Sequence, residues 1–142
     1  MTDDRERNSE FVRRTFEEGW NESTFDFLEG GSAAEIVFHY NGSTQHVTPD
    51  SLPGLVEKWR QGFPDLRMNV RHVIADGDLV AVNLTLTGTH LGEWAGLQAS
   101  GAPVSVEEMM VFRFEEGLLV EMWEVFDEQG LRRQITSSGG HA

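Results

Sequence analysis

Between residues 66 and 114, apolar residues recur with a period of two and glycine-containing segments interrupt the pattern, and residues 118–127 form a further strand-like run that is apolar on both faces. Such alternation is typical of half-buried β-strands, because successive side chains of a strand point to opposite faces of the sheet. The pattern predicts four long strands, over residues 66–74, 79–89, 104–114 and 118–127. Tight turns at residues 76–78 and 115–117 indicate antiparallel hairpins, and residues 91–103 form a glycine-rich loop.

The first 65 residues carry a helical period instead. Val12, Phe16 and Trp20 recur every four residues, which predicts a helix over residues 4–20. Thr48-Pro49 is typical of a helix start, and this second helix is expected to end at residues 62–64. We expect the remaining elements to be a short helix near residues 23–28, a strand over residues 34–40 and a short last helix over residues 128–135.

Helices followed by consecutive antiparallel strands indicate the α+β class. We expect a cone-shaped, curved, mixed or antiparallel sheet, a half-barrel, which the N-terminal helices close so that a cavity remains between them. The 142 residues suit one domain, with a core over about residues 8–136 and a flexible tail over residues 137–142.

The composition excludes several classes of function. The chain has no cysteine, so disulfides and thiolate metal sites are excluded. Its net charge of −13 disfavours nucleic acids and anionic membranes as partners. Lys58 is the only lysine, and this acidic, lysine-poor composition resembles that of proteins from salt-loving archaea. A charged N-terminus and the lack of a long apolar run predict a cytoplasmic protein.

Ionisable residues interrupt apolar strand faces, where an unpaired polar group costs free energy. Counting by two puts His72 on the face of Met68, and Glu121 on the face of Leu119. The full set of such residues is His39, His72, His90, Glu108, Glu121 and Asp127. A pocket that mixes buried carboxyls, whose pKa rises, with buried histidines, whose pKa falls, suits general acid/base chemistry near neutral pH.

Each of these residues also has a purely structural interpretation. Asp127 could cap the last helix, and His90 could hold the glycine-rich loop in place. His39 could bond a backbone carbonyl, His72 could be a satisfied core or interface residue, and the glutamates could pair with arginines. Aromatic residues expected near the pocket, as its walls or as core, are Tyr40, Trp59, Trp94 and Trp123.

Five ordered motifs resemble the SnoaL-like polyketide cyclase family, within the nuclear-transport-factor-2-like superfamily, over about residues 10–135. They are Phe63-Pro64-Asp65-Leu66, Gly77-Asp78-Leu79-Val80-Ala81, the segment from Thr87 to Gly96, Phe112-Arg113-Phe114 and Glu121-Met122-Trp123. The resemblance implies an α+β cone, a homodimer or higher oligomer, and a cavity in which an aldol condensation closes a ring without metal or cofactor. Asp127 matches the family's acid/base aspartate, and His39 matches one of its cavity histidines. Glu107 and Glu108 stand where the family has a further histidine.

We therefore expect a cofactor-free enzyme that acts on a small apolar carbonyl compound. Asp127 would move the proton, and His39 and His90 would stabilise the enolate oxygen. Substrate-binding residues would be Tyr40, Trp59, His72, Trp94, Glu108, Glu121 and Trp123. No spacing typical of a metal site occurs, so no metal is expected.

Two alternatives remain open. One is a non-catalytic domain that binds a small ligand or serves dimerisation, and the other is an epoxide hydrolase-like enzyme that uses Asp127, Glu108 and Arg113. The last strands are apolar on both faces, which predicts that one face lines the pocket and the other forms a homodimer interface.

Overall fold

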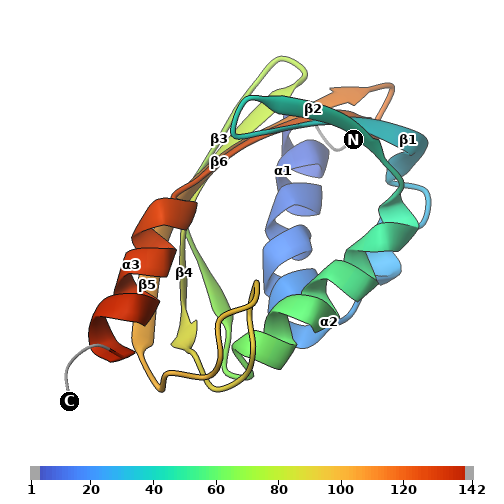
Figure 1. Ribbon diagram of the computed structural model, residues 1–142. Helices are drawn as coiled ribbons and strands as arrows, with labels where there is room; N and C mark the ends of the chain where they lie inside the picture. The colour runs from blue at the N-terminus through green and yellow to red at the C-terminus, as the bar shows by residue number, and fades with distance from the viewer. Residues whose placement is uncertain (1–3, 140–142) are drawn as a thin grey trace.

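The computed structural model describes residues 4–139, which form one curved sheet with helices against its concave face (Figure 1). The helices are α1 (Asp4–Arg14), its π-helical continuation η1 (Thr15–Trp20), the 3₁₀ turns η2 (Asp26–Leu28) and η3 (Pro49–Ser51), α2 (Leu52–Gly62) and α3 (Glu128–Gly139). The strands are β1 (Ser32–Tyr40), β2 (Ser43–Val47), β3 (Arg67–Asp76), β4 (Leu79–Thr89), β5 (Pro103–Glu115) and β6 (Leu118–Phe126).

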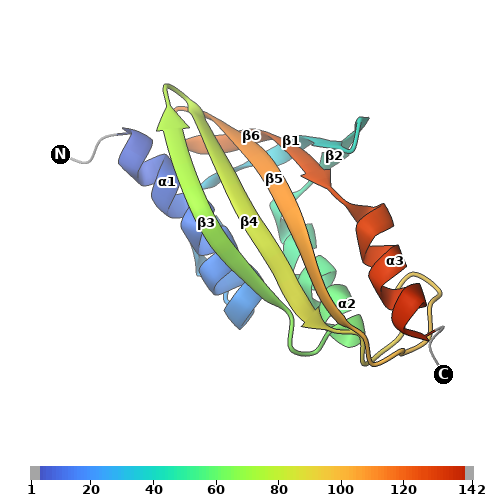
Figure 2. The same cartoon turned by 90° about the vertical axis from the view of Figure 1, so that its left-hand side faces the viewer.

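The six strands lie in the order β2-β1-β6-β5-β4-β3. β1 runs parallel to β6, and every other neighbouring pair is antiparallel. The sheet arches over α1 and α2, and α3 follows β6 at one end (Figures 1 and 2). The predicted α+β class, with a mixed curved sheet covered by N-terminal helices, is confirmed, and the sheet does not close into a barrel.

The core lies between the concave face of the sheet and the first helices. Val12 and Leu84 are fully buried, and Phe16 meets Phe112 edge to face at a centroid distance of 6.2 Å. The predicted helical stripe of α1 is therefore the stripe that packs on the sheet.

Two β-bulges shift the alternation of inward and outward side chains. On β6, Phe114 pairs with Leu119 but Arg113 pairs with Glu121, so Val120 is an extra residue. On β3, Val70 pairs with Leu84 but His72 pairs with Asn83, so Arg71 is an extra residue. Side chains beyond each bulge point to the face opposite to the one that counting by two predicts.

Three side-chain amides each form two hydrogen bonds with the backbone of one strand residue, one with its N–H and one with its C=O. They do so on a strand edge that no neighbouring strand occupies. Asn21 pairs in this way with Met68 at 2.7 and 2.9 Å, and Asn41 pairs with Phe126 at 2.9 and 3.0 Å. Gln134 of α3 pairs with Ser105 at 2.8 and 2.9 Å. These amide clamps fix helices and turns to the ends of the strands.

The strand β2 was not predicted, because its residues are exposed or half-buried and carry no apolar alternation. The last helix, predicted to end at residue 135, continues through residues 136–139 of α3. Residues 140–142 of the expected tail lie outside the described residues.

Candidate functional site

Two chambers lie between the concave face of the sheet and the helices, and they share part of their lining. The narrow chamber, of about 120 Å³, reaches from the centre of the sheet toward α1, η1 and η3. The wide chamber, of about 270 Å³, reaches toward α2 and the start of α3. Both chambers are lined by Trp20, Phe38, Leu55, Glu108 and Glu124.

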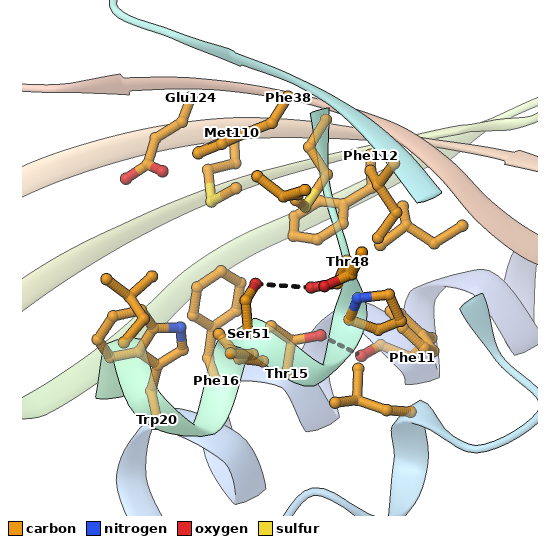
Figure 3. A pocket seen from close by; sticks show the side chains of 18 of the residues that line it. Phe11, Thr15, Phe16, Trp20, Phe38, Thr48, Ser51, Met110, Phe112 and Glu124 are labelled. Carbon is orange, nitrogen blue, oxygen red and sulfur yellow. Dashed lines mark hydrogen bonds between the residues drawn. The ribbon is translucent and has the colours of Figure 1, made fainter. Parts of the chain in front are cut away.

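The narrow chamber is almost wholly apolar. Figure 3 shows side chains of the sheet facing those of the helices across it, with Phe38, Met110, Phe112 and Glu124 on one side and Phe11, Thr15, Phe16 and Trp20 on the other. The hydroxyls of Thr15 and Ser51 already donate to the backbone carbonyls of Phe11 and Thr48, at 2.9 and 2.6 Å. The carboxyls of Glu108 and Glu124 are therefore the main polar groups that can still serve a ligand there.

Glu108 and Glu124 form a buried carboxyl pair on the inner face of the sheet. Glu108 lies opposite Phe126, and Glu124 lies opposite Met110, so the two are diagonal neighbours across β5 and β6. Burial raises the pKa of Glu108, which is 3% exposed, and its hydrogen bond with Glu124 raises it further. Burial also raises the pKa of Glu124, although the hydrogen bond with Glu108 lowers it, and the charge of Glu128 has a smaller upward effect. Both carboxyls therefore hold a proton more strongly than an exposed glutamate does, which suits general acid/base work.

Tyr40 and Glu128 form a second polar pair in the wide chamber. The Tyr40 hydroxyl donates to Glu128 Oε1 at 2.5 Å. Burial and this hydrogen bond raise the pKa of Tyr40, so the phenol stays protonated. Tyr40 lies opposite Glu124 on the neighbouring strand, and therefore all four polar groups face one space.

Asp127 does not line either chamber. It is exposed at the junction of β6 and α3, and its Oδ1 accepts the Gly130 N–H at 2.8 Å. A Cβ at position 130 would lie 2.2 Å from Asp127 Oδ2, so glycine makes this close approach possible. The prediction that Asp127 faces the pocket is wrong, and its structural alternative, the helix cap, is what the geometry shows.

His39, Glu121 and Trp123 lie on the outer face of the sheet, so the prediction that they line the cavity is also wrong. The bulge at Val120 turns Glu121 and Trp123 outward, and His39 lies opposite Trp123 on β1. His39 stacks on Trp123 at 5.2 Å, and its Nε2 lies 2.6 Å from Glu121 Oε2. The hydrogen bonds from His39 and Arg113 hold the pKa of Glu121 below its usual value.

His72 is likewise on the outer face, because the bulge at Arg71 reverses the phase of β3. It is exposed, and its Nδ1 lies 3.0 Å from Asn83 Oδ1. The prediction that His72 shares a face with Met68 is therefore wrong, because the bulge at Arg71 lies between the two residues.

His90 is fully buried but lies in the corner of the glycine-rich loop and lines neither chamber. Its Nδ1 lies 2.9 Å from Ser100 Oγ, and its ring packs on Phe63. Trp94 packs behind Trp59 at 5.3 Å, and Trp59 itself lines the wide chamber. Of the predicted site residues, the structure therefore brings Tyr40, Trp59 and Glu108 together in the cavity.

The residues of the epoxide hydrolase-like alternative do not meet. Glu108 faces the cavity, Asp127 caps α3, and Arg113 bonds Glu121 on the outer face at 2.9 Å. Within residues 4–139, no group of three or more His, Cys, Asp or Glu side chains could hold a metal ion. No helix in that range is both long and apolar enough to cross a membrane.

Glu124 and Glu128 line the cavity but were not among the predicted site residues. Glu124 interrupts the apolar set Met122 and Phe126, and that interruption was a usable signal. Both faces of β6 are apolar, however, so periodicity alone did not show which face was inward. Glu128 had no comparable signal, because it reaches the cavity only through the bend between β6 and α3.

The family model for SnoaL-like polyketide cyclases matches residues 10–135. No protein of curated function matches the sequence. Among solved structures, a Jannaschia sp. CCS1 protein provisionally described as a SnoaL-like polyketide cyclase is 26% identical, with 96% of each chain covered and a TM-score of 0.82.

Two Streptomyces proteins are also similar to the chain. AclR of Streptomyces galilaeus, provisionally described as a hydroxylase, is 28% identical over 93% of this chain and 82% of its own, with a TM-score of 0.76. IdmH of Streptomyces antibioticus, provisionally described as a polyketide cyclase, is 23% identical over 90% of this chain and 97% of its own, with a TM-score of 0.75, which supports the fold alone.

Proposed function

The chain belongs to the SnoaL-like polyketide cyclase family, and we propose that it is a cofactor-independent acid/base enzyme that acts on a small, largely apolar carbonyl compound. The observation that carries this proposal is the pair of Glu108, which is buried, and Glu124, which together face the largely apolar narrow chamber. Two carboxyls that share one proton supply an acid and a base side by side.

The proposed reaction begins with the pair holding one proton. The carboxylate takes the proton from the carbon next to the substrate carbonyl, while the protonated partner gives its proton to the carbonyl oxygen. The product is a neutral enol, and the pair again holds one proton on the opposite carboxyl. In a ring closure, the enol carbon then attacks a second carbonyl of the same molecule. The enol proton returns to the carboxylate, and the other carboxyl protonates the new alkoxide.

Exchange of α-protons tests this proposal without knowledge of the natural substrate. We expect the protein to accelerate deuterium uptake by β-tetralone in heavy water, followed by NMR. Glu108→Gln and Glu124→Gln should each lower the rate about 100-fold or more. Glu107→Gln is the matched control, because Glu107 lies on the same strand but points outward.

Exchange that persists in both cavity variants would rule out the carboxyl pair as the catalyst. A wild-type protein that binds β-tetralone but does not accelerate exchange would favour the alternative of a non-catalytic ligand-binding domain.

We also propose that two copies associate through the outer face of the sheet. Ile74, Ala81, Val111 and Trp123 form one row straight across four strands. Met109 and Val125 extend it in the next row, and Ile74, Val125 and Met109 are 67%, 65% and 55% exposed. A contiguous apolar surface of this kind favours a protein partner, and a second copy presents the same surface.

A further inference from the structure

The wide chamber concentrates negative charge without a cation to balance it. Glu108, Glu124 and Glu128 line it, and none of the described residues that line either chamber is Lys, Arg or His. Elsewhere the carboxylates Glu18 and Glu121 bond Arg14 and Arg113 at 2.8 and 2.9 Å. These two carboxylates each have an arginine partner, whereas the hydrogen bond of the buried Glu108 is with another carboxyl, that of Glu124.

Aromatic rings form much of the wall of the same chamber. The rings belong to Trp20, Phe38, Tyr40, Trp59 and Phe126. Trp59 meets Phe126 edge to face at 5.7 Å, and the Tyr40 hydroxyl is held by Glu128. The faces of such rings attract cations through their quadrupole, most strongly where water is excluded. The aromatic lining and the glutamates without a cationic residue in the lining are separate features, and both favour a positively charged ligand.

We propose that the wide chamber binds ligands that carry a protonated amine, prefers them to neutral analogues of the same shape, and rejects carboxylates. The amine would lie among Glu108, Glu124 and Glu128, and the apolar remainder of the ligand would extend toward the narrow chamber, whose lining includes Phe16 and Phe112. This inference deepens the proposed function, since it names the charge of the ligand for the same cavity.

Three matched ligands test the inference by titration calorimetry at neutral pH: phenethylamine, phenethyl alcohol and phenylacetate. We expect the amine to bind about tenfold more tightly than the alcohol or better, and phenylacetate not to bind. The double variant Glu108→Gln, Glu124→Gln keeps the shape of the cavity and should lose most of the preference for the amine, with Glu128 as the one glutamate left of the three. Glu107→Gln and Glu121→Gln, both on the outer face, should keep the preference.

Equal binding of amine and alcohol by the wild type, or a preference that is undiminished in the double variant, would overturn the inference. So would binding of none of the three ligands. The two proposals remain separable, because β-tetralone carries no amine. Intact α-proton exchange without amine preference removes this inference alone, and amine preference without exchange removes the proposed catalysis alone.

Discussion

Glu108 is almost completely buried, and its neighbour Glu124 is also a carboxylic acid. Its pKa is raised first by burial and then by Glu124, so the folded protein favours its protonated form. A raised pKa means that the folded state pays a free-energy cost whenever this carboxyl ionises. Glu121, which lies on the opposite face of the same sheet, has a lowered pKa because His39 and Arg113 bond it. The pKa values of two glutamates of one domain thus shift in opposite directions because the two residues lie on opposite faces of the sheet.

Glu108→Gln should stabilise the protein, and the gain should grow as the pH rises. A carboxyl whose pKa is higher in the folded than in the unfolded protein contributes to the free energy of unfolding. This contribution is fully present below the pKa of the unfolded state, about 4.3, and it is lost as the pH rises through the pKa of the folded state. A tenfold change in proton affinity corresponds to about 1.4 kcal/mol. Urea unfolding of wild type and variant near pH 5 and pH 8 measures the difference, with Glu107→Gln as the control. If the free energy of unfolding of wild type and of Glu108→Gln changed equally between the two pH values, the raised pKa of Glu108 would be contradicted.

Asp127 acts on α3 through its hydrogen bond to the Gly130 N–H, and a cap of this kind tolerates a neutral side-chain acceptor. Asp127→Ala should lower the free energy of unfolding by about 1 kcal/mol, whereas Asp127→Asn should cost only a fraction of that. The rate of α-proton exchange should stay within about twofold of wild type in Asp127→Asn, because the carboxyl pair is untouched. A much larger loss of α-proton exchange in a fully folded Asp127→Asn variant would show that Asp127 takes part in the reaction.

At the scale of the element, regular alternation was predictable and its interruptions were not. β4 and β5 pair without a bulge over their whole shared length, and there the sequence correctly placed Glu108 inward. β3 and β6 each contain one extra residue, which reversed the expected faces of His72 and Glu121. Neither Arg71 nor Val120 differs in type from an ordinary strand residue, so the local sequence carries no mark of the bulge. The fold class survives such errors because it depends on the existence of strands, whereas a site depends on their phase.

The clamp of Asn41 fixes the turn after β1 to the end of β6, close to Tyr40 and Glu128. Asn41 has a positive φ of 45°, so a replacement tests both backbone and side chain. Asn41→Gly keeps the backbone permissive and removes only the two amide hydrogen bonds to Phe126. We expect it to lower the free energy of unfolding by about 1–3 kcal/mol. Hydrogen exchange of the Phe126 amide should accelerate, and unchanged protection of that amide would contradict the clamp.

At the scale of the whole molecule, a net charge of −13 opposes the proposed association of two copies. The apolar outer face favours a dimer, and salt screens the repulsion between the two acidic surfaces. Sedimentation should therefore show a dimer that tightens between about 0.1 and 1 M NaCl, over which the Debye length falls from about 10 to 3 Å.

Val125→Glu, in the centre of the outer face, should give a folded monomer at either salt concentration. Leu91→Glu is the control, because Leu91 is 56% exposed on the glycine-rich loop, away from that face. A dimer that persists in Val125→Glu, or one that Leu91→Glu abolishes equally, would place the interface elsewhere.

The extra residue Val120 also affects how homologous positions should be matched. A relative that lacks one residue here would form a regular strand and still direct the counterparts of Met122, Glu124 and Phe126 inward. An alignment must then place its gap at position 120, because a gap placed after Glu124 would equate a cavity carboxyl with a side chain on the opposite face. When two chains differ by such a deletion, the percentage of identical residues in the alignment no longer tells whether the residues that line the two cavities are the same. Only the identity of the cavity-lining residues indicates shared chemistry.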